Sequence, residues 1–239
     1  MLEEILSNKI VILLLFAFLP PLIYTVWIRN TERYKRQSWS SILLCFLWGA
    51  TIAIVFSVIL EGLFNISLSI SVTNPDKLAF LTVVILAPLV EEFAKPLALR
   101  LKHVKKNLEE LEDGLIYGAV AGLGFSATEN LLYGVTFLSK GLFIFMVLMG
   151  IRSIGGCLLH ASATALTGYG YGKTILKRTS FIRVLPYFIL AVLLHASYNF
   201  LVSYELLGLL IGLVLAIMLV VFTMSMIRKV IRQLDATSR

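Results

Sequence analysis

The chain has 239 residues, of which 59% are hydrophobic and 15% are charged, with a net charge of +7. Soluble domains are roughly half apolar and about one quarter charged, so a soluble protein of this size could not bury so much apolar side chain. The composition therefore excludes a soluble enzyme and a disordered chain, and it predicts an integral membrane protein.

Apolar runs in chain order predict an all-α bundle of about seven transmembrane helices. A helix needs about 20 predominantly apolar residues to cross the hydrocarbon core of a bilayer. The first run has neither the basic leading segment nor the small-residue cleavage site of a signal peptide, so it is interpreted as an uncleaved span. The predicted spans are approximately 9–28, 39–60, 77–100, 114–138, 142–172, 184–203 and 206–227.

The basic residues alternate between the two sides of this predicted bundle. Of the 21 Lys and Arg residues, 16 lie in four alternate segments, at 29–36, 100–106, 173–183 and 228–239. Cytoplasmic loops carry such an excess of positive charge, so the pattern predicts an outside N-terminus and a cytoplasmic C-terminus. It also explains the basic composition by contact with the anionic lipid bilayer, so no nucleic-acid partner is expected.

Seven ionisable side chains interrupt the apolar runs. Five of them are nominally charged and cost about 3 kcal/mol apiece at the centre of a lipid-facing helix, so we expect them to face one another or a hydrated cavity. Counted at about 1.5 Å per residue from the basic ends of the spans, four of them lie at compatible depths, whereas Arg152 does not obviously join them. The seven residues are Glu91, Glu92, Lys95, Glu129, Arg152, His160 and His195.

Spacing along the helices predicts which of these side chains meet. Glu91 and Lys95 are four residues apart and share a helix face, as do His195 and Asn199. The pentapeptide LLHAS ends at Ser162 and recurs, ending at Ser197, on the neighbouring span of opposite direction. We therefore expect the two histidines to face each other. A stripe of Gly114, Gly118 and Gly122 predicts a close helix contact nearby.

Together these motifs resemble the PrsW family of intramembrane proteases. Residues 91–95 read EEFAK and match an E-E-x-x-K signature, and residues 122–130 read GLGFSATEN and match G-x-G-F-x-x-x-E-N. The resemblance covers about 77–203 and places the chain in the wider group of CAAX-prenyl endopeptidases and Abi proteins. The order is completed by Arg152, His160, His195 and Asn199.

The resemblance implies a role for each motif residue. Glu91 is the base that activates a water, Glu129 takes the place of the residue that positions this water, and His195 with Asn199 stabilises the oxyanion. Prenyl-protease relatives have His where this chain has Glu129, so His160 is the alternative water-positioning residue. Those relatives also carry Arg at the position of Lys95, which favours the PrsW branch.

The remaining intramembrane residues have supporting roles in this interpretation. Glu92 and Lys95 are expected to tune the base, because a nearby ammonium favours the ionised form of a carboxylate. Arg152 is either a counter-ion for Glu129 or a residue that extends toward the outer surface. Peptide hydrolysis by such a set requires no cofactor.

Two alternatives use the same residues. Glu91, Glu129, His160 and His195 are a plausible ligand set for Zn²⁺ with an open position for water, which would make the protein a zinc-dependent protease. A proton-coupled secondary transporter would also keep such residues near the membrane midplane, but it usually shows inverted repeats. A non-catalytic membrane chaperone or receptor is a third class.

The sequence therefore predicts one transmembrane domain, 1–239, with a motif-bearing catalytic core at 77–203. The peripheral helices and the basic tail lie at 1–60 and 206–239. The expected function is intramembrane endopeptidase cleavage of membrane-anchored proteins, which in relatives include an anti-sigma factor. The expected location is the cell membrane.

Overall fold

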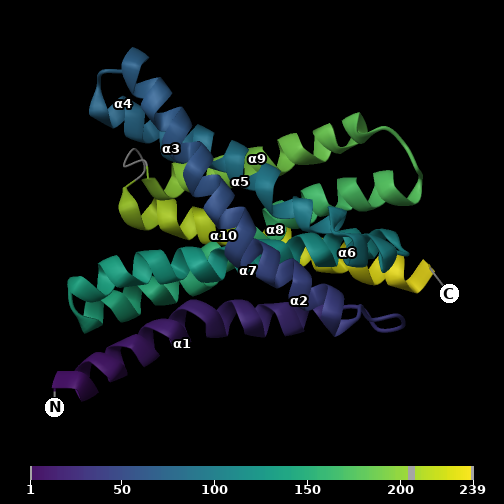
Figure 1. The fold of residues 1–239 in the computed structure, drawn as a ribbon, viewed down its shortest axis with the longest axis horizontal. Coiled ribbons are helices and arrows are strands. Elements are labelled where there is room, and N and C mark those ends of the chain that lie inside the picture. Colours follow the sequence, from purple (N-terminus) through teal and green to yellow (C-terminus); the bar gives the residue numbers. More distant parts are fainter. Residues whose placement is uncertain (1, 204–207, 238–239) are drawn as a thin grey trace.

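The computed structural model describes residues 2–203 and 208–237, which form a helical bundle with no strand (Figure 1). Four short helical segments, labelled η, have π or 3₁₀ winding and continue neighbouring α-helices. In chain order the elements are α1 (Leu2–Arg29), α2 (Trp39–Trp48), η1 (Gly49–Ala53), α3 (Ile54–Ser71), α4 (Pro75–Phe80), η2 (Leu81–Leu86), α5 (Ala87–Ala94), η3 (Lys95–Arg100), α6 (Lys102–Lys106), α7 (Leu111–Ser139), α8 (Leu142–Leu176), η4 (Phe181–Val184), α9 (Leu185–Ser203) and α10 (Leu209–Thr237).

Five helical rods are long and apolar enough to cross a membrane. They confirm an all-α, multi-pass integral membrane protein. The predicted spans 77–100 and 114–138 are helical as well, but they lie outside this set of five, so the count of seven stays a prediction. Residues 206 and 207, at the start of the last predicted span, lie outside the described residues. The five rods are Lys9–Arg29, Trp39–Ser71, Leu142–Leu176, Phe181–Ser203 and Leu209–Thr237.

Within the predicted span 77–100, the winding changes at both ends of α5. A π-helical segment, η2, leads into the regular helix α5, and the 3₁₀ segment η3 follows. Each change lies beside a proline, Pro88 or Pro96, which lacks the backbone N–H of a regular helix. Departures from α-helical winding often mark functional sites, and this one flanks the double-glutamate motif on both sides.

Helices α7 and α8 form the close contact that the glycine stripe predicts. A Cβ atom on Gly118 would lie 2.4 Å from the carbonyl oxygen of Thr164. A Cβ atom on Gly122 would lie 2.1 Å from the carbonyl oxygen of His160. Side chains at either position would separate the two backbones, so these glycines bring α7 directly against the part of α8 that carries His160.

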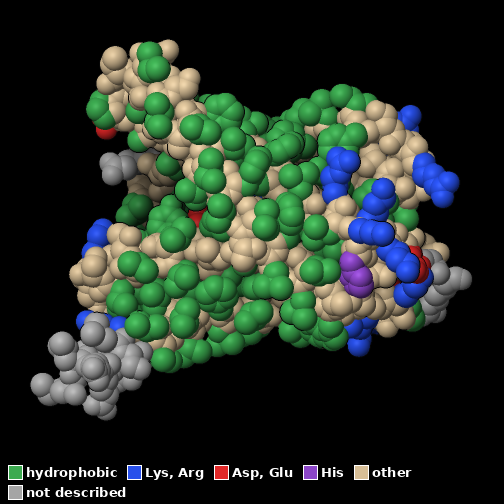
Figure 2. Space-filling model, viewed as in Figure 1, with side chains coloured by type: hydrophobic (Ala, Val, Ile, Leu, Met, Phe, Trp, Pro, Cys, Tyr) green, Lys and Arg blue, Asp and Glu red, His purple; other side chains and the backbone are tan. Residues whose placement is uncertain are grey.

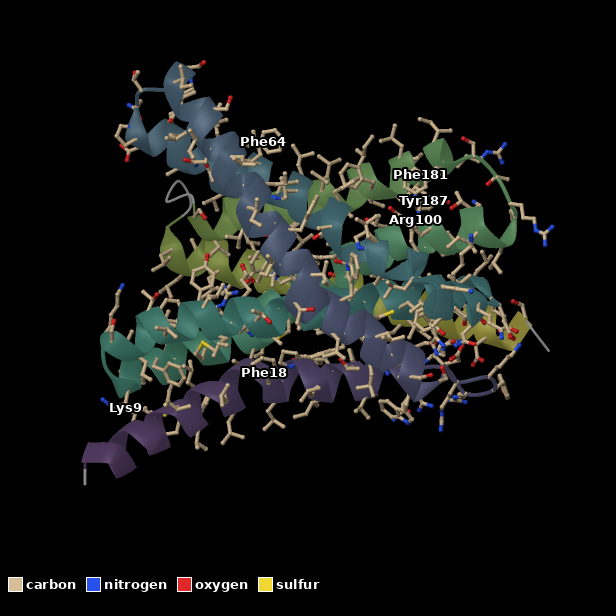
Figure 3. All side chains as sticks on the ribbon, viewed as in Figure 1. Lys9, Phe18, Phe64, Arg100, Phe181 and Tyr187 are labelled. Carbon is tan, nitrogen blue, oxygen red and sulfur yellow. The ribbon has the colours of Figure 1, made fainter. Side chains whose placement is uncertain are left out.

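The basic segments gather at one end of the bundle, here called the basic end. Figure 2 shows most of the visible Lys and Arg side chains at the right, while many apolar side chains lie across the middle of this face. Lys9 lies near the left end of the molecule in Figure 3, and Arg100 lies in its right half. The arrangement agrees with the alternation of basic loops in the sequence. That the basic end faces the cytoplasm stays a prediction.

Candidate active site

Four segments bring the predicted residues together in the interior of the bundle. Helix α5 carries Glu91 and Glu92, and Lys95 opens η3 directly after it. Helix α7 carries Glu129. Helix α8 supplies Arg152 and His160, and α9 supplies His195 and Asn199. Residues far apart in sequence therefore form one polar cluster within an apolar protein, which relieves the cost of placing each charge in lipid.

Glu92 is fully buried and is held by three donors. Its Oε1 accepts hydrogen bonds from Lys95 Nζ at 2.8 Å and lies 2.9 Å from His195 Nδ1. Its Oε2 accepts a hydrogen bond from the Thr164 hydroxyl at 2.9 Å. A buried carboxylate is stable when it is paired and hydrogen-bonded in this way, so Glu92 is a fixed anchor for its neighbours.

Glu91 occupies the centre of the cluster. Its Oε2 lies 2.8 Å from Lys95 Nζ, 3.7 Å from His160 Nδ1 and 4.0 Å from His195 Nδ1. This oxygen is buried and makes no hydrogen bond to a described residue. The Lys95 ammonium neutralises this oxygen, and a carboxylate oxygen can accept more than one donor, so the atom has capacity for a further hydrogen bond from a water.

Glu129 links His160 to Arg152. Its Oε2 lies 2.8 Å from His160 Nε2 and accepts a hydrogen bond from the Arg152 guanidinium at 2.6 Å. Arg152 Nε also donates to Asn130 Oδ1 at 2.9 Å. Arg152 is therefore a counter-ion for Glu129, one of its two expected roles, although the depth count alone did not place it with the other residues. Arg152 lies about two helical turns from His160 along α8, but its long side chain extends as far as Glu129. A depth count from backbone positions does not include the length of the side chain.

The two histidines face each other, as the repeated LLHAS pentapeptide predicts. Their ring centroids are 5.2 Å apart and the rings meet edge to face. Lys95 Nζ lies 2.9 Å from His160 Nδ1, and an ammonium can only donate, so Nδ1 accepts and Nε2 carries the proton toward Glu129. Asn199 donates one amide hydrogen to the Val83 carbonyl at 2.9 Å, which joins α9 to η2.

A cavity of about 400 Å³ opens beside this cluster. Glu91, His160 and His195 contribute to its wall, as do Tyr198 and Asn199. Its size suits a short stretch of polypeptide together with water. Motif residues from four helices therefore line one shared cavity, in agreement with the expectation that they face a common space.

Four residues at the site were missed by the sequence analysis. Glu61 lines the cavity, although the second span was predicted to end at residue 60. The apolar run continues beyond it to Ser71, which was the available signal that Glu61 lies within a rod. Thr164 and Asn130 act as hydrogen-bond partners of charged groups, and Tyr198 lines the cavity. Such neutral residues carry no distinctive sequence signal.

The cluster contains metal-ligating atoms, but in this arrangement it does not fit a bound metal. Atoms of Glu91, Glu92, His160 and His195 all lie within 4.8 Å of one another, a set that differs from the predicted one by Glu92 in place of Glu129. Lys95 Nζ, however, lies 2.8–2.9 Å from three of these residues. A zinc ion bound at about 2.0–2.2 Å from the same atoms would need the space that the ammonium fills.

The fold and the site define a multi-pass helical membrane protein with an acid–imidazole centre in its interior. The chain belongs to the PrsW family, because the family model described as PrsW family intramembrane metalloprotease matches residues 37–226. The chain is also 36% identical over 125 residues to Protease PrsW of Clostridioides difficile (strain 630). This match covers 51% of the chain and 50% of that protein, so the chain spans about half the length of its curated relative. No solved structure matches the chain.

Proposed function

We propose that this protein is an intramembrane endopeptidase that hydrolyses membrane-anchored proteins with a water activated by Glu91. The observation that carries the proposal is the position of Glu91 Oε2. It is a buried oxygen that pairs with the Lys95 ammonium at 2.8 Å and lies within 4.0 Å of two imidazoles, and Glu91 itself contributes to the wall of the cavity. Membership of a family described as intramembrane proteases supports the reaction class.

The two glutamates of the motif have different roles in this proposal. Both oxygens of Glu92 are engaged, by Lys95 and His195 on one side and Thr164 on the other. Moving a proton onto Glu92 would break a fully satisfied network, which is unfavourable in a buried site. Glu91 has one close charged partner, Lys95 at 2.8 Å, whereas Glu92 is held by three donors, so Glu91 is the more readily protonated of the two. Glu91 is therefore the general base, and Glu92 holds Lys95 and His195 in position.

The reaction follows from this placement. Glu91 takes a proton from water as the water oxygen attacks the substrate carbonyl carbon. The tetrahedral intermediate then collapses, the C–N bond breaks, and the proton passes from Glu91 to the leaving amine. His160 keeps Nε2–H directed at Glu129, so it orients the site without moving a proton. The closed apolar surroundings strengthen each electrostatic contact.

Stabilisation of the oxyanion is assigned to Asn199 and His195. Asn199 has a second amide hydrogen beyond the one donated to Val83. His195 uses Nδ1 toward Glu92, so only Nε2 is left for the cavity, and Nε2 donates only when the ring is protonated. A neutral His195 would instead accept a hydrogen bond from the attacking water. Either form places a polar atom beside the reacting group.

The topology and the substrate class belong to the same proposal. Seven crossings with an outside N-terminus would place the basic end in the cytoplasm, in agreement with the basic loops. The substrates would be single-span membrane proteins, such as anti-sigma-factor-like proteins. The EEFAK motif further supports a place within the wider group that includes the CAAX-prenyl endopeptidases.

The test is cleavage of membrane proteins by purified protein in proteoliposomes. Single-span proteins of the same host serve as the substrate pool, and new N-termini are identified by mass spectrometry. Glu91→Gln preserves the shape of the side chain and should abolish cleavage, a loss of at least about 10³-fold. The exposed Glu109→Gln is the matched control and should cleave at the wild-type rate. Wild-type cleavage by Glu91→Gln would show that the base is elsewhere.

A zinc-dependent mechanism is the second candidate, because four ligand-type residues converge and the family model is described as a metalloprotease. It requires the Lys95 ammonium to leave its place among them. Metal analysis of the purified protein and cleavage after chelation separate the two mechanisms. Full activity in metal-free protein supports the glutamate mechanism. Loss of activity that stoichiometric Zn²⁺ restores would establish the metal mechanism.

A further inference from the structure

A second acidic cluster lies at the basic end, away from the cavity residues. It joins the loop between α1 and α2, the start of α7 and the end of α10. Asp235 on α10 accepts a hydrogen bond from the backbone N–H of Arg33 at 2.8 Å, which brings these elements together. The acids in this region are Glu32, Glu110, Glu112, Asp113 and Asp235.

Three of these carboxylates converge on one point. One oxygen from each of Glu32, Glu110 and Glu112 lies within 4.8 Å of the other two. Glu32 is completely buried and Glu112 is 2% exposed. Oxygens that ligate one Ca²⁺-sized ion at about 2.3–2.6 Å lie up to about 5 Å apart, so the spacing suits a hard divalent cation.

Two of the oxygens have no partner in the part of the chain described here. Glu32 Oε1 and Glu110 Oε2 are buried and make no hydrogen bond to a described residue. Neither Glu32 nor Glu110 forms an ion pair with a described Lys or Arg, and the nearby Lys35 pairs with Glu109 instead. Buried carboxylate oxygens without a donor are costly, so a cation bound between them would stabilise this cluster.

The ligands are already held in place by neighbouring groups. The second oxygen of Glu32 accepts a hydrogen bond from the backbone N–H of Gln37 at 3.1 Å. Asp113 accepts hydrogen bonds from the backbone N–H groups of Glu109 and Glu110, at 2.7 and 2.8 Å, and from the Gln37 amide. A site that is ordered before binding loses little conformational entropy when an ion arrives.

We propose that Glu32, Glu110 and Glu112 bind one divalent cation of the oxygen-preferring class, such as Mg²⁺, Mn²⁺ or Ca²⁺. The ion fastens the loop after α1 to the start of α7 at the basic end. This site is separate from the Glu91 centre and does not depend on the proposed protease activity. Burial and the neighbouring acids raise the pKa of Glu32 to about 8, in agreement with a cluster that lacks a counter-charge.

The test uses full-length protein in detergent, stripped of metal with EDTA. Mn²⁺ is the first probe, because the fraction bound is measured directly by electron paramagnetic resonance, and Mg²⁺ and Ca²⁺ then compete with it. Wild-type protein should bind one Mn²⁺ saturably at this site, with a rise in melting temperature. Glu32→Gln and Glu112→Gln should each weaken that binding at least about tenfold, whereas the exposed control Glu109→Gln should retain it.

A separate control tests whether Mn²⁺ binds at the Glu91 centre. Glu91→Gln should retain the Mn²⁺ that depends on Glu32 and Glu112. Binding that is lost in Glu91→Gln but kept in Glu32→Gln would assign the ion to the catalytic cluster and overturn the proposal. Wild-type protein that binds no Mn²⁺ at millimolar concentration would also overturn it, and this outcome does not depend on whether any variant folds.

Discussion

Removal of the Lys95 charge is the most direct perturbation of the active-site cluster. Three carboxylates, Glu91, Glu92 and Glu129, share the site with two permanent cations, Lys95 and Arg152. Lys95→Met keeps the length and the apolar stem of the side chain but leaves two carboxylates without their 2.8 Å partner. Loss of one partner from a buried pair costs about 3–5 kcal/mol, so we expect a decrease of this size in the free energy of unfolding.

The unfolding assay can use the cysteines of the protein. Cys45 and Cys157 are free and fully buried, so a thiol-reactive fluorescent dye labels them only when the bundle opens. Lys95→Met should lower the melting temperature in detergent at neutral pH. The double variant Lys95→Met/Glu92→Gln removes one of the uncompensated charges and should recover about 2 kcal/mol or more relative to the single variant.

Additive effects of Glu92→Gln and Lys95→Met on stability would refute this reasoning. If Glu92→Gln and Lys95→Met lower stability independently, the two side chains are not coupled in the folded protein as the 2.8 Å contact requires. Lys35→Met is the matched control, because Lys35 is an exposed partner of Glu109, and it should leave the melting temperature unchanged.

Two further predictions concern packing and pH. Gly122→Ala places a methyl group against the His160 carbonyl and should destabilise the protein by about 1–3 kcal/mol and reduce cleavage. Gly150→Ala is the control, because its Cβ meets open space, and it should change neither stability nor cleavage. Stability is measured with the thiol-reactive dye and cleavage in proteoliposomes. In EDTA buffer, stability should fall as pH rises from about 5 to 8. Burial raises the pKa of Glu32 to about 8, that of Glu112 to about 7 and that of Asp113 to about 6, so these groups hold protons in this range that the unfolded chain has lost. Glu32→Gln should therefore reduce the pH dependence of the melting temperature, most clearly between about pH 7 and 8.

The sequence was most informative where lipid made polar residues costly. Glu91, Glu129, His160 and His195 stand out because each interrupts an apolar run, and the structure brings all four to one site. The facing of the two histidines also followed from sequence, because equal distances from a shared loop place residues at equal depth on antiparallel helices.

Other features depend on tertiary structure that periodicity does not encode. Helical spacing puts Glu91 and Glu92 on different faces, but it does not show which of them would be saturated by donors from other helices. The Thr164 hydroxyl donates a hydrogen bond to Glu92, but the chain has many threonines and nothing in the sequence distinguishes this one. The winding changes around α5 arise from prolines within one apolar run, and such a run reads as a single regular span.

The glycine contact between α7 and α8 also decides which walls of the site can move. At Gly122 the backbones of α7 and α8 are in direct contact, and Glu129 on α7 lies 2.8 Å from His160 on α8. A substrate could not separate these two helices without disrupting the contact between Glu129 and His160. Helix α3, which crosses in front of the bundle in Figure 1, is held more weakly, since only Ile54 and Ser57 of its 18 residues are buried. A substrate polypeptide that enters laterally from the lipid would therefore meet the rigid α7–α8 pair on one side and the more easily displaced helix α3 on the other.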